Sequence, residues 1–475
     1  MQNIFGKLKE LGYKTCPEDF YGNIATWKSW YMGDVADFHH YKVWNGQKHI
    51  QCRRFTLGMA KKVCEDWANL LMNEKVALTL EGESEQAFFD QTCEENNFRV
   101  KANELEELTF FGGTSAIVVS AENVPVNERT GQIVGTGGRL RFDYVHMPNI
   151  YPLSWANGRV RDCAFATEKV NGNDKYLYLT VHHVGESGTY VIENYLFRDN
   201  NGSLTEVELS ELEELQNVAK RIETGSTDRQ FVINRPNIVN NLNPTLPLGV
   251  SIFANAVDQL KGVDIVYDAY VNEFVLGKKR IMVKTEALKS IDGEYAFDPN
   301  DVVFHALPED SSAGAEANII HEIDMSLRTP QLNEGIQDML NNLSSKVGFG
   351  ENHYKYDRGS ISTATQIISE NSTLFRTIKK HELVLESVLT ELARIILRMG
   401  NTYCGQALNE EVEISVDFDD SIITDKQADF QRDMAMLSAG ILNPWEFRAT
   451  WMNEDESTAK AALPKMEELV SSEKT

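Results

Sequence analysis

The sequence has little cysteine, no long apolar run and a shortage of basic residues. Its six cysteines form no CxxC pair and no Cys/His cluster at zinc spacing, which argues against a disulfide framework and fits a reducing cytoplasm. An uninterrupted apolar stretch of about 18 residues is also missing, so no membrane span is expected. The N-terminus lacks the apolar core of a signal peptide. These absences favour a soluble, intracellular protein.

The shortage of basic residues makes the chain strongly acidic. Its 46 Lys and Arg residues stand against 71 Asp and Glu residues, a net charge of −25 over 475 residues. Such a chain does not grip nucleic acid as a whole, because phosphate binding needs a positive field, but it can let nucleic acid pass. The hydrophobic content of 42% is enough for folded cores, and the length suggests roughly two to four domains.

Nucleotide-binding motifs are missing as well. The glycine-rich stretches "GTGGR" at 135–139 and "GFG" at 348–350 match neither the P-loop nor the dinucleotide fingerprint. The first lies between two runs with strand-like alternation, which is typical of a hairpin turn. We therefore expect no nucleotide cofactor.

Catalytic and metal-binding patterns are equally weak. The adjacent pairs His39–His40 and His182–His183 would point to opposite faces of a strand, so ordinary surface or partly buried histidines are favoured over metal ligands. No GxSxG motif occurs. Among the carboxylates, the cluster Asp417, Asp419 and Asp420 is the strongest candidate for a catalytic site. A solvated strand end explains it more simply. Nothing here predicts an enzyme, a metal site or any other cofactor.

Periodicity predicts a mixed α+β protein. Alternating residues from Ser115 to about Phe197 indicate antiparallel strands, and the polar, punctuated stretch 200–250 suggests a linker. A strand "EVEISVDF" and a helical tail from about Thr424 end the chain. Apolar residues recur at helical spacing in further segments, with Thr56, Thr329 and Thr363 as start signals and Gly400 as a stop. These helices are expected at 56–73, 83–111, 251–276, 330–346 and 363–400.

The two helices 251–276 and 330–346 bracket a short insert with strand-like residues. This order predicts an antiparallel helix pair with the insert at one end and the loop 344–358 at the other. The pair carries more apolar surface than two helices can bury on each other. Neighbouring copies in an oligomer could bury the rest.

Three stretches in this order resemble a known family. The segments "WYMGDVADFHHYKVWNGQKHIQCRRFTLGMAKKVCEDWANLLMNEKVAL", "TATQIISENSTLFRTIKKHE" and "GILNPWEFRATWMNEDESTAKAAL" resemble the portal proteins of long-tailed bacteriophages of Gram-positive hosts. The resemblance spans nearly the whole chain. None of the three stretches is a catalytic signature, so the specificity comes from their order.

The resemblance implies the parts of a portal subunit. Besides the α/β wing, these are an antiparallel helical stem, a small β-containing clip, a tunnel loop followed by a long kinked helix, and a helical crown. Their expected bounds are 1–250 and 359–423 for the wing, 251–278 and 326–343 for the stem, 279–325 for the clip, 344–358 for the tunnel loop and 424–475 for the crown.

It also implies a function in the virion. Such a protein would form a ring, usually of twelve copies, at one vertex of the capsid, after assembly in the host cytoplasm. The ring would nucleate capsid assembly with the major capsid and scaffolding proteins, dock the terminase motor and later receive the head–tail adaptor. It would conduct double-stranded DNA during packaging and ejection. No enzyme activity and no membrane contact are implied, since ATP hydrolysis would belong to the terminase.

Residue roles follow from the resemblance as expectations. The glycines of the loop would let it change shape, and its cations and aromatics would touch DNA transiently. Three cations at the stem–clip junction could face the channel, although capping of the preceding helix explains them equally well. The loop residues are Lys346, Gly348, Phe349, Gly350, Asn352, His353, Tyr354 and Lys355, and the junction residues are Lys278, Lys279 and Arg280.

Two other classes of protein stay open at this point. A different virion structural protein, such as a minor capsid or adaptor protein, would form no ring with an axial DNA channel. A divergent metal-dependent nuclease would use the acid cluster at 417–420.

Overall fold

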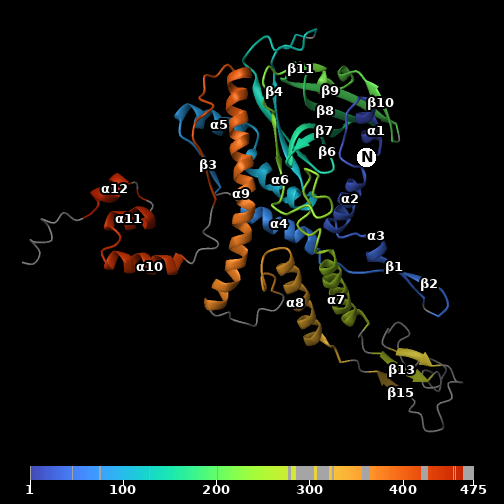
Figure 1. Ribbon diagram of the computed structural model, residues 1–475. Helices are drawn as coiled ribbons and strands as arrows, with labels where there is room; N and C mark the ends of the chain where they lie inside the picture. The colour runs from blue at the N-terminus through green and yellow to red at the C-terminus, as the bar shows by residue number, and fades with distance from the viewer. Residues whose placement is uncertain are drawn as a thin grey trace, which may run out of the picture. The chain divides into compact units, whose positions relative to one another are not determined.

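The structure is a computed structural model in which nearly all of the chain outside two long stretches and the C-terminal end is described. Figure 1 shows its elements. The described residues are 2–44, 46–73, 76–127, 129–200, 202–276, 280–284, 304–307, 320–323, 326–355, 364–418, 426–452, 454 and 456–463.

The chain divides into two compact units, Met1–Asp417 and Phe418–Thr475. The second unit contains α10 (Lys426–Ser438), α11 (Pro444–Met452) and α12 (Glu456–Ala461). Its aromatic residues pack together: the rings of Phe430 and Trp451 lie 5.1 Å apart, and that of Phe447 lies 5.5 Å from Phe430. These contacts give the small helices a common core.

The larger sheet of the first unit is antiparallel and has six strands, in the order β10-β9-β8-β7-β6 with β11 paired to β9. It arises from the alternating segments, whose apolar residues face the core. Cys163 opposite His182 is one of its registered pairs. The strands are β6 (Ile150–Ala156), β7 (Arg159–Asn171), β8 (Asp174–Val184), β9 (Tyr190–Asn200), β10 (Ser203–Val207) and β11 (Arg221–Glu223).

A second sheet of three strands has the order β12-β4-β5. β4 (Ser115–Glu122) and β5 (Arg139–His146) come from the predicted strand region, but β12 (Phe231–Asn234) comes from the predicted linker. The expectation of a linker over 200–250 was therefore wrong, since β10 and β11 from its first half also belong to the six-stranded sheet. Phe231 and Val250 are fully buried, so apolar burial fixes this polar-looking stretch on the sheet.

The N-terminal helices pack beside these sheets in the first unit. The predicted helices at 56–73 and 83–111 are present, the second as two helices separated by Asn96 and Asn97. Thr56 does not cap the first of them, because the residue before its first turn is Gly58 at φ +70°. The helices are α1 (Gln2–Glu10), α2 (Asp19–Tyr31), α3 (Ala36–His39), α4 (Met59–Leu71), α5 (Glu83–Glu95) and α6 (Phe98–Gly112).

The longest helix, α9 (Ala364–Tyr403), runs past the second sheet, as Figure 1 shows. It does not stop at Gly400 as expected but continues for three more residues. Glu391 fixes it to the sheet, since both of its carboxylate oxygens accept hydrogen bonds from Arg229, at 2.9 and 2.8 Å. Thr363, its expected cap, lies outside the described residues.

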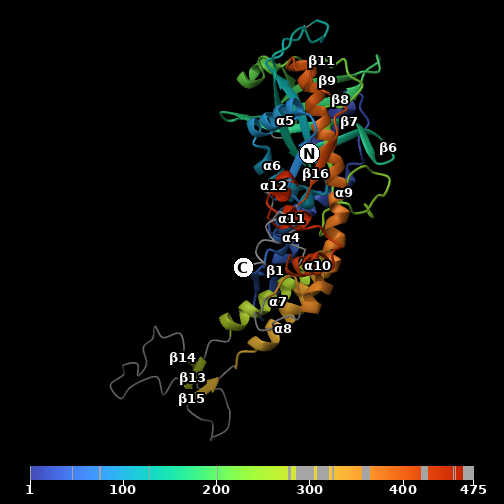
Figure 2. The same ribbon diagram turned by 90° about the vertical axis from the view of Figure 1, so that its left-hand side faces the viewer.

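Helices α7 (Val257–Leu276) and α8 (Thr329–Lys346) form the expected pair and lie side by side in both views (Figure 1 and Figure 2). α7 begins six residues later than predicted, because Ser251–Ala256 is a buried irregular segment. Pro330 occupies the first turn of α8, and its cap position is Arg328 rather than Thr329. Between the two helices β13 (Arg280–Lys284) pairs with β14 (Phe304–Leu307) and β15 (Ile320–Ile323).

Two small sheets complete the described fold. β1 (His40–Trp44) and β2 (His49–Arg53) form a hairpin, and β3 (Ala77–Leu80) pairs with β16 (Ile414–Asp417). Separate clusters of helices accompany sheets whose strands are mostly antiparallel. The predicted α+β class is confirmed.

A buried carboxylate on α7 ties this helix to the N-terminal segments. One oxygen of Asp264 accepts hydrogen bonds from the Thr56 hydroxyl at 3.2 Å and the Leu57 N–H at 2.8 Å, and the other lies 3.0 Å from Nε2 of His39. The Val35 N–H donates to Nδ1 of His39, so Nε2 carries the proton that it donates to Asp264. The buried charge is thereby fully hydrogen-bonded, as burial requires.

We expect Asp264→Ala to lower the free energy of unfolding by about 3 kcal/mol or more, because buried donors left without an acceptor cost roughly 1–3 kcal/mol each. Asp258→Ala is the matched control on the same helix, since that side chain is 87% exposed. It should change stability by less than about 0.5 kcal/mol. Urea unfolding followed by circular dichroism measures both variants. Equal losses of stability would contradict the anchoring role of Asp264.

Candidate functional site: the loop after helix α8

The loop begins with a glycine that ends α8. The N–H of Phe349 donates to the Ser344 carbonyl at 3.0 Å and that of Gly348 to the Ser345 carbonyl, the two bonds of a Schellman motif. This motif needs a left-handed residue, and Gly348 has φ +95°. A Cβ at this position would lie 2.8 Å from Cγ2 of Thr377 on α9. Only glycine fits, so Gly348 serves as a fixed turn in this structure.

Phe349 anchors the loop in the protein core. Its side chain is only 2% exposed, and its ring stacks on Trp67 of α4 with the centroids 4.6 Å apart and an angle of 16° between the planes. The Trp67 indole N–H donates to the Val347 carbonyl at 3.2 Å, and His353 stacks on Phe349 at 4.2 Å. The Phe349 ring is therefore part of the interior and not of an exposed surface.

Tyr354 holds the second half of the loop. Its hydroxyl donates to a carboxylate oxygen of Asp66 on α4 at 2.9 Å, and its carbonyl accepts from the Gln337 amide on α8 at 2.8 Å. Burial and the neighbouring Asp66 carboxylate raise the pKa of Tyr354 well above its usual range, so the phenol keeps its proton. Gly350 at φ +88° and Asn352 at φ +62° supply the turns between the two anchors.

The two lysines of the loop and His353 remain at the surface, but partial burial lowers the pKa of His353, so its ring is neutral near pH 7. Lys346, His353 and Lys355 are exposed around the buried aromatic anchor. The described part of the loop, up to Lys355, is thus a packed turn that presents basic side chains outward. Residues 356–358 of the predicted tunnel loop lie outside the described residues.

The second group of predicted site residues falls between α7 and β13. Arg280 is the first residue of β13 and is registered with Ile323 of β15. Lys278 and Lys279 lie outside the described residues. Their proposed place at a stem–clip junction stays a prediction.

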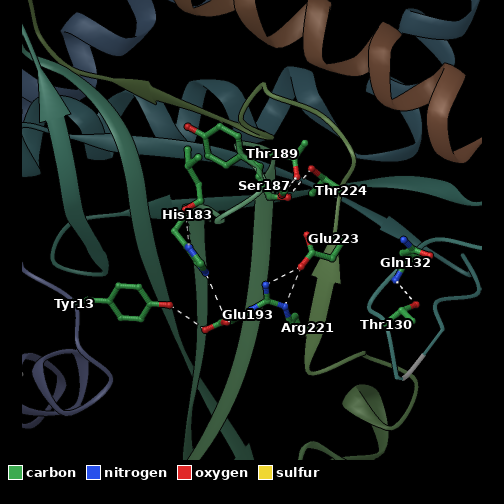
Figure 3. Close-up of polar contacts among 12 residues, drawn as sticks. Tyr13, Thr130, Gln132, His183, Ser187, Thr189, Glu193, Arg221, Glu223 and Thr224 are labelled. Atoms are coloured by element: carbon green, nitrogen blue, oxygen red, sulfur yellow. Dashed lines mark hydrogen bonds and ion pairs between the residues drawn. The ribbon is translucent and has the colours of Figure 1, made fainter.

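A further polar cluster, which the sequence did not indicate, lies on the large sheet (Figure 3). Glu193 on β9 accepts hydrogen bonds from the hydroxyl groups of Tyr13 at 2.9 Å and Tyr195 at 2.5 Å, and it pairs with Arg221 at 2.8 Å. His183 on β8 lies 3.7 Å away. The His183 contact and these donors lower the pKa of Glu193 to about 2. The cluster fastens the segment after α1 to the sheet.

The pair His182–His183 separates as strand geometry predicts, whereas His39 ends α3 and His40 begins β1. His182 is buried and His183 on the next position is half-buried, while His39 is buried against Asp264 and His40 is exposed beside Asp34. The expectation of only surface or partly buried histidines was wrong for His39 and His182. Burial lowers the pKa of His182 to about 3, so it is neutral near pH 7.

The alternative of a metal-dependent nuclease gains no support from the described residues. In the described part of the chain, no three His, Cys, Asp or Glu side chains come together as a metal site would need. Asp417 is exposed at the end of β16, and Asp419 and Asp420 lie outside the described residues. Among the helices that the structure describes, none has the length and apolar character to cross a bilayer.

The chain is similar to a known protein family over nearly its whole length. The model of the family described as "Phage portal protein, SPP1 Gp6-like" matches residues 13–467. A search of the curated proteins found no match. Among solved structures, one described as "Neck of native GTA particle computed with C12 symmetry" is similar, with 9% identity and a TM-score of 0.40, covering 89% of this chain and 98% of that one.

We expect Phe349→Ala to lower the free energy of unfolding by about 3 kcal/mol, because truncating a buried phenylalanine typically costs 3–5 kcal/mol. His353→Ala removes the exposed ring of the same stack and should cost less than about 1 kcal/mol. Urea unfolding of both variants measures the difference. A Phe349→Ala protein as stable as His353→Ala would show that the loop is not anchored through this ring.

Glu193→Gln tests the cluster through its pH dependence. Because the pKa of Glu193 is lowered to about 2, its ionised form stabilises the fold above the ordinary carboxyl pKa, and this contribution is lost as the pH falls through that range toward 2. The same contact raises the pKa of His183. The stabilisation that protonated His183 contributes to the fold is therefore present at low pH, and it is lost as the pH rises through the raised pKa.

The melting temperature of the wild-type protein should therefore exceed that of Glu193→Gln most at about pH 5 to 6, between these two titrations. The difference should shrink toward pH 3. Glu186→Gln, an exposed carboxyl on the neighbouring turn, is the control. A difference between wild type and Glu193→Gln that stays constant from pH 3 to pH 8 would contradict this account.

Proposed function

Since the chain belongs to the family of SPP1 Gp6-like phage portal proteins, we propose that it forms a ring at one vertex of the capsid and conducts double-stranded DNA through it. The match of the family over residues 13–467 is the observation that carries this proposal. The family is one of structural components of the virion, not of enzymes. The proposed ring has twelve copies, the number that the resemblance implies.

The charge of the chain suits a conduit. A net charge of −25 on each copy repels the phosphates of DNA, so a duplex can slide without being held. A few exposed cations can still make transient contacts near the axis. Lys346 and Lys355 have this role in the proposal, with Gly348, Phe349, Gly350, Asn352, Tyr354 and the neutral ring of His353 as the turn that presents them.

The proposed parts of the subunit follow the elements. Helices α7 and α8 would be the stem, the strands β13–β15 the clip, and the C-terminal helices α10–α12 the crown. The sheets with α1–α6 and most of α9 would be the wing. The clip would dock the terminase and then the head–tail adaptor, and the outer surface would meet the capsid and scaffolding proteins.

The anchored loop changes how DNA contact would work. The described turn is fixed to α4 by Trp67 and Asp66, so its cations are held in place and are not carried by a freely moving chain. In this proposal Gly348 and Gly350 have a structural role in the turn.

We expect the double substitution Lys346→Glu and Lys355→Glu to leave ring assembly intact but to reduce the fraction of DNA-filled heads several-fold, because it replaces phosphate attraction with repulsion. A phage genome that lacks this protein, complemented with either variant or wild type, provides the assay. Lys9→Glu with Lys28→Glu makes the same change of net charge on exposed residues of α1 and α2 and is the control. Normal filling by the loop variant would overturn the proposed contact.

A further inference from the structure

The β1–β2 hairpin projects from the first unit beside α7 (Figure 1). Its register pairs His40 with Arg53 and Trp44 with His49. In the described part of the hairpin most positions of both strands are exposed, so neither face of the ribbon is covered within one copy. An isolated two-stranded hairpin is at best marginally stable in water. We therefore expect the surface of another molecule to cover the exposed faces of the hairpin.

The two faces of the hairpin have different chemistry. Residues directly opposite each other share a face, so Lys42, Trp44 and Arg53 lie on one face, and Val43 with its partner Ile50 lies on the other. Trp44 is 57% exposed, and Val43 and Ile50 are 44% and 42% exposed. Residues 40–53 contain no Asp or Glu, in a chain with 71 of them. The hairpin thus offers a basic, aromatic surface that fits an acidic partner.

The segments that flank the hairpin and the helix α8 contact opposite sides of α7. A Cβ at Gly262 would lie 3.0 Å from Met339 of α8, whereas Asp264, two positions further, bonds the Thr56–Leu57 segment that follows the hairpin. Two positions correspond to about 200° around a helix of 3.6 residues per turn. A hairpin on one side of α7 and α8 on the other gives each copy two different lateral surfaces.

An exposed surface of α8, about a quarter turn from the residues that contact α7, is acidic. Glu334 and Asp338 are exposed and lie one turn apart, each next to a residue that faces α7. The stretch 329–345 contains no Lys or Arg. This surface therefore complements the hairpin in charge and lies on the other helix of the pair.

We propose that the hairpin of one copy binds the Glu334–Asp338 surface of α8 in the next copy. The contact joins two different surfaces, which is the kind of interface that closes into a ring when the rotation between copies fits. It rests on the proposed ring assembly and adds the lateral interface to it. Lys42 and Arg53 would pair with the two carboxylates, and Trp44 would be covered in the joint.

Charge reversal tests the interface. Lys42→Glu with Arg53→Glu should raise the protein concentration needed for half-maximal assembly at least about tenfold, because like charges placed together in an interface cost several kcal/mol. Mass photometry of the purified full chain measures assembly. Lys28→Glu with Lys175→Glu changes the net charge equally on exposed residues elsewhere and should assemble like wild type. Unchanged melting temperatures confirm that each variant folds.

The complementary reversal makes the result specific. Glu334→Lys with Asp338→Lys should weaken assembly alone and should restore it when combined with the hairpin reversal. A hairpin variant that assembles like wild type, or a combined variant with no recovery, would overturn the interface. Normal assembly with loss of DNA-filled heads would assign the hairpin to nucleic acid instead. Failure of the wild-type protein to assemble would count against the proposed ring itself, a distinct outcome.

Discussion

The stacking of Phe349 on Trp67 is the contact on which the arrangement of the helices around the loop depends. Trp67 is fully buried, and besides Phe349 it meets Phe110 of α6 at 5.7 Å and His381 of α9 at 5.0 Å between ring centroids. One side chain thereby joins α4, α6, α9 and the turn after α8. Burial lowers the pKa of His381 to about 3, so the cluster holds no charge near pH 7.

A second constraint acts at the other side of this region, where α7 leaves the body. Asp264 and Asp268 would be costly to bury unless hydrogen-bonded, and both accept from the segment 55–57. The helix pair is therefore held from two directions, through carboxylates on α7 and through an aromatic stack after α8. In the proposed ring, this rigid attachment would keep twelve loops at a common height and orientation around the DNA.

Much of the fold could be predicted from periodicity, because strands 115–197 and the helices α4, α8 and α9 have strong apolar patterns. The segment 231–250 was missed, since its burial depends on pairing with β4, which is more than one hundred residues away in the chain. The position of the loop between α8 and α9 was predicted correctly. The burial of Phe349 was not, because its partner Trp67 is remote in sequence and the residue was interpreted as a surface aromatic. Two aspartates one turn apart in the apolar stripe of α7 were a signal that could have indicated the anchor.

Electron microscopy of the purified full-length protein tests the central claim most directly. The account predicts ring-shaped particles with rotational symmetry and an open central channel wide enough for a DNA duplex. Symmetric particles with a closed centre would contradict the conduit, and would favour another structural role in the virion.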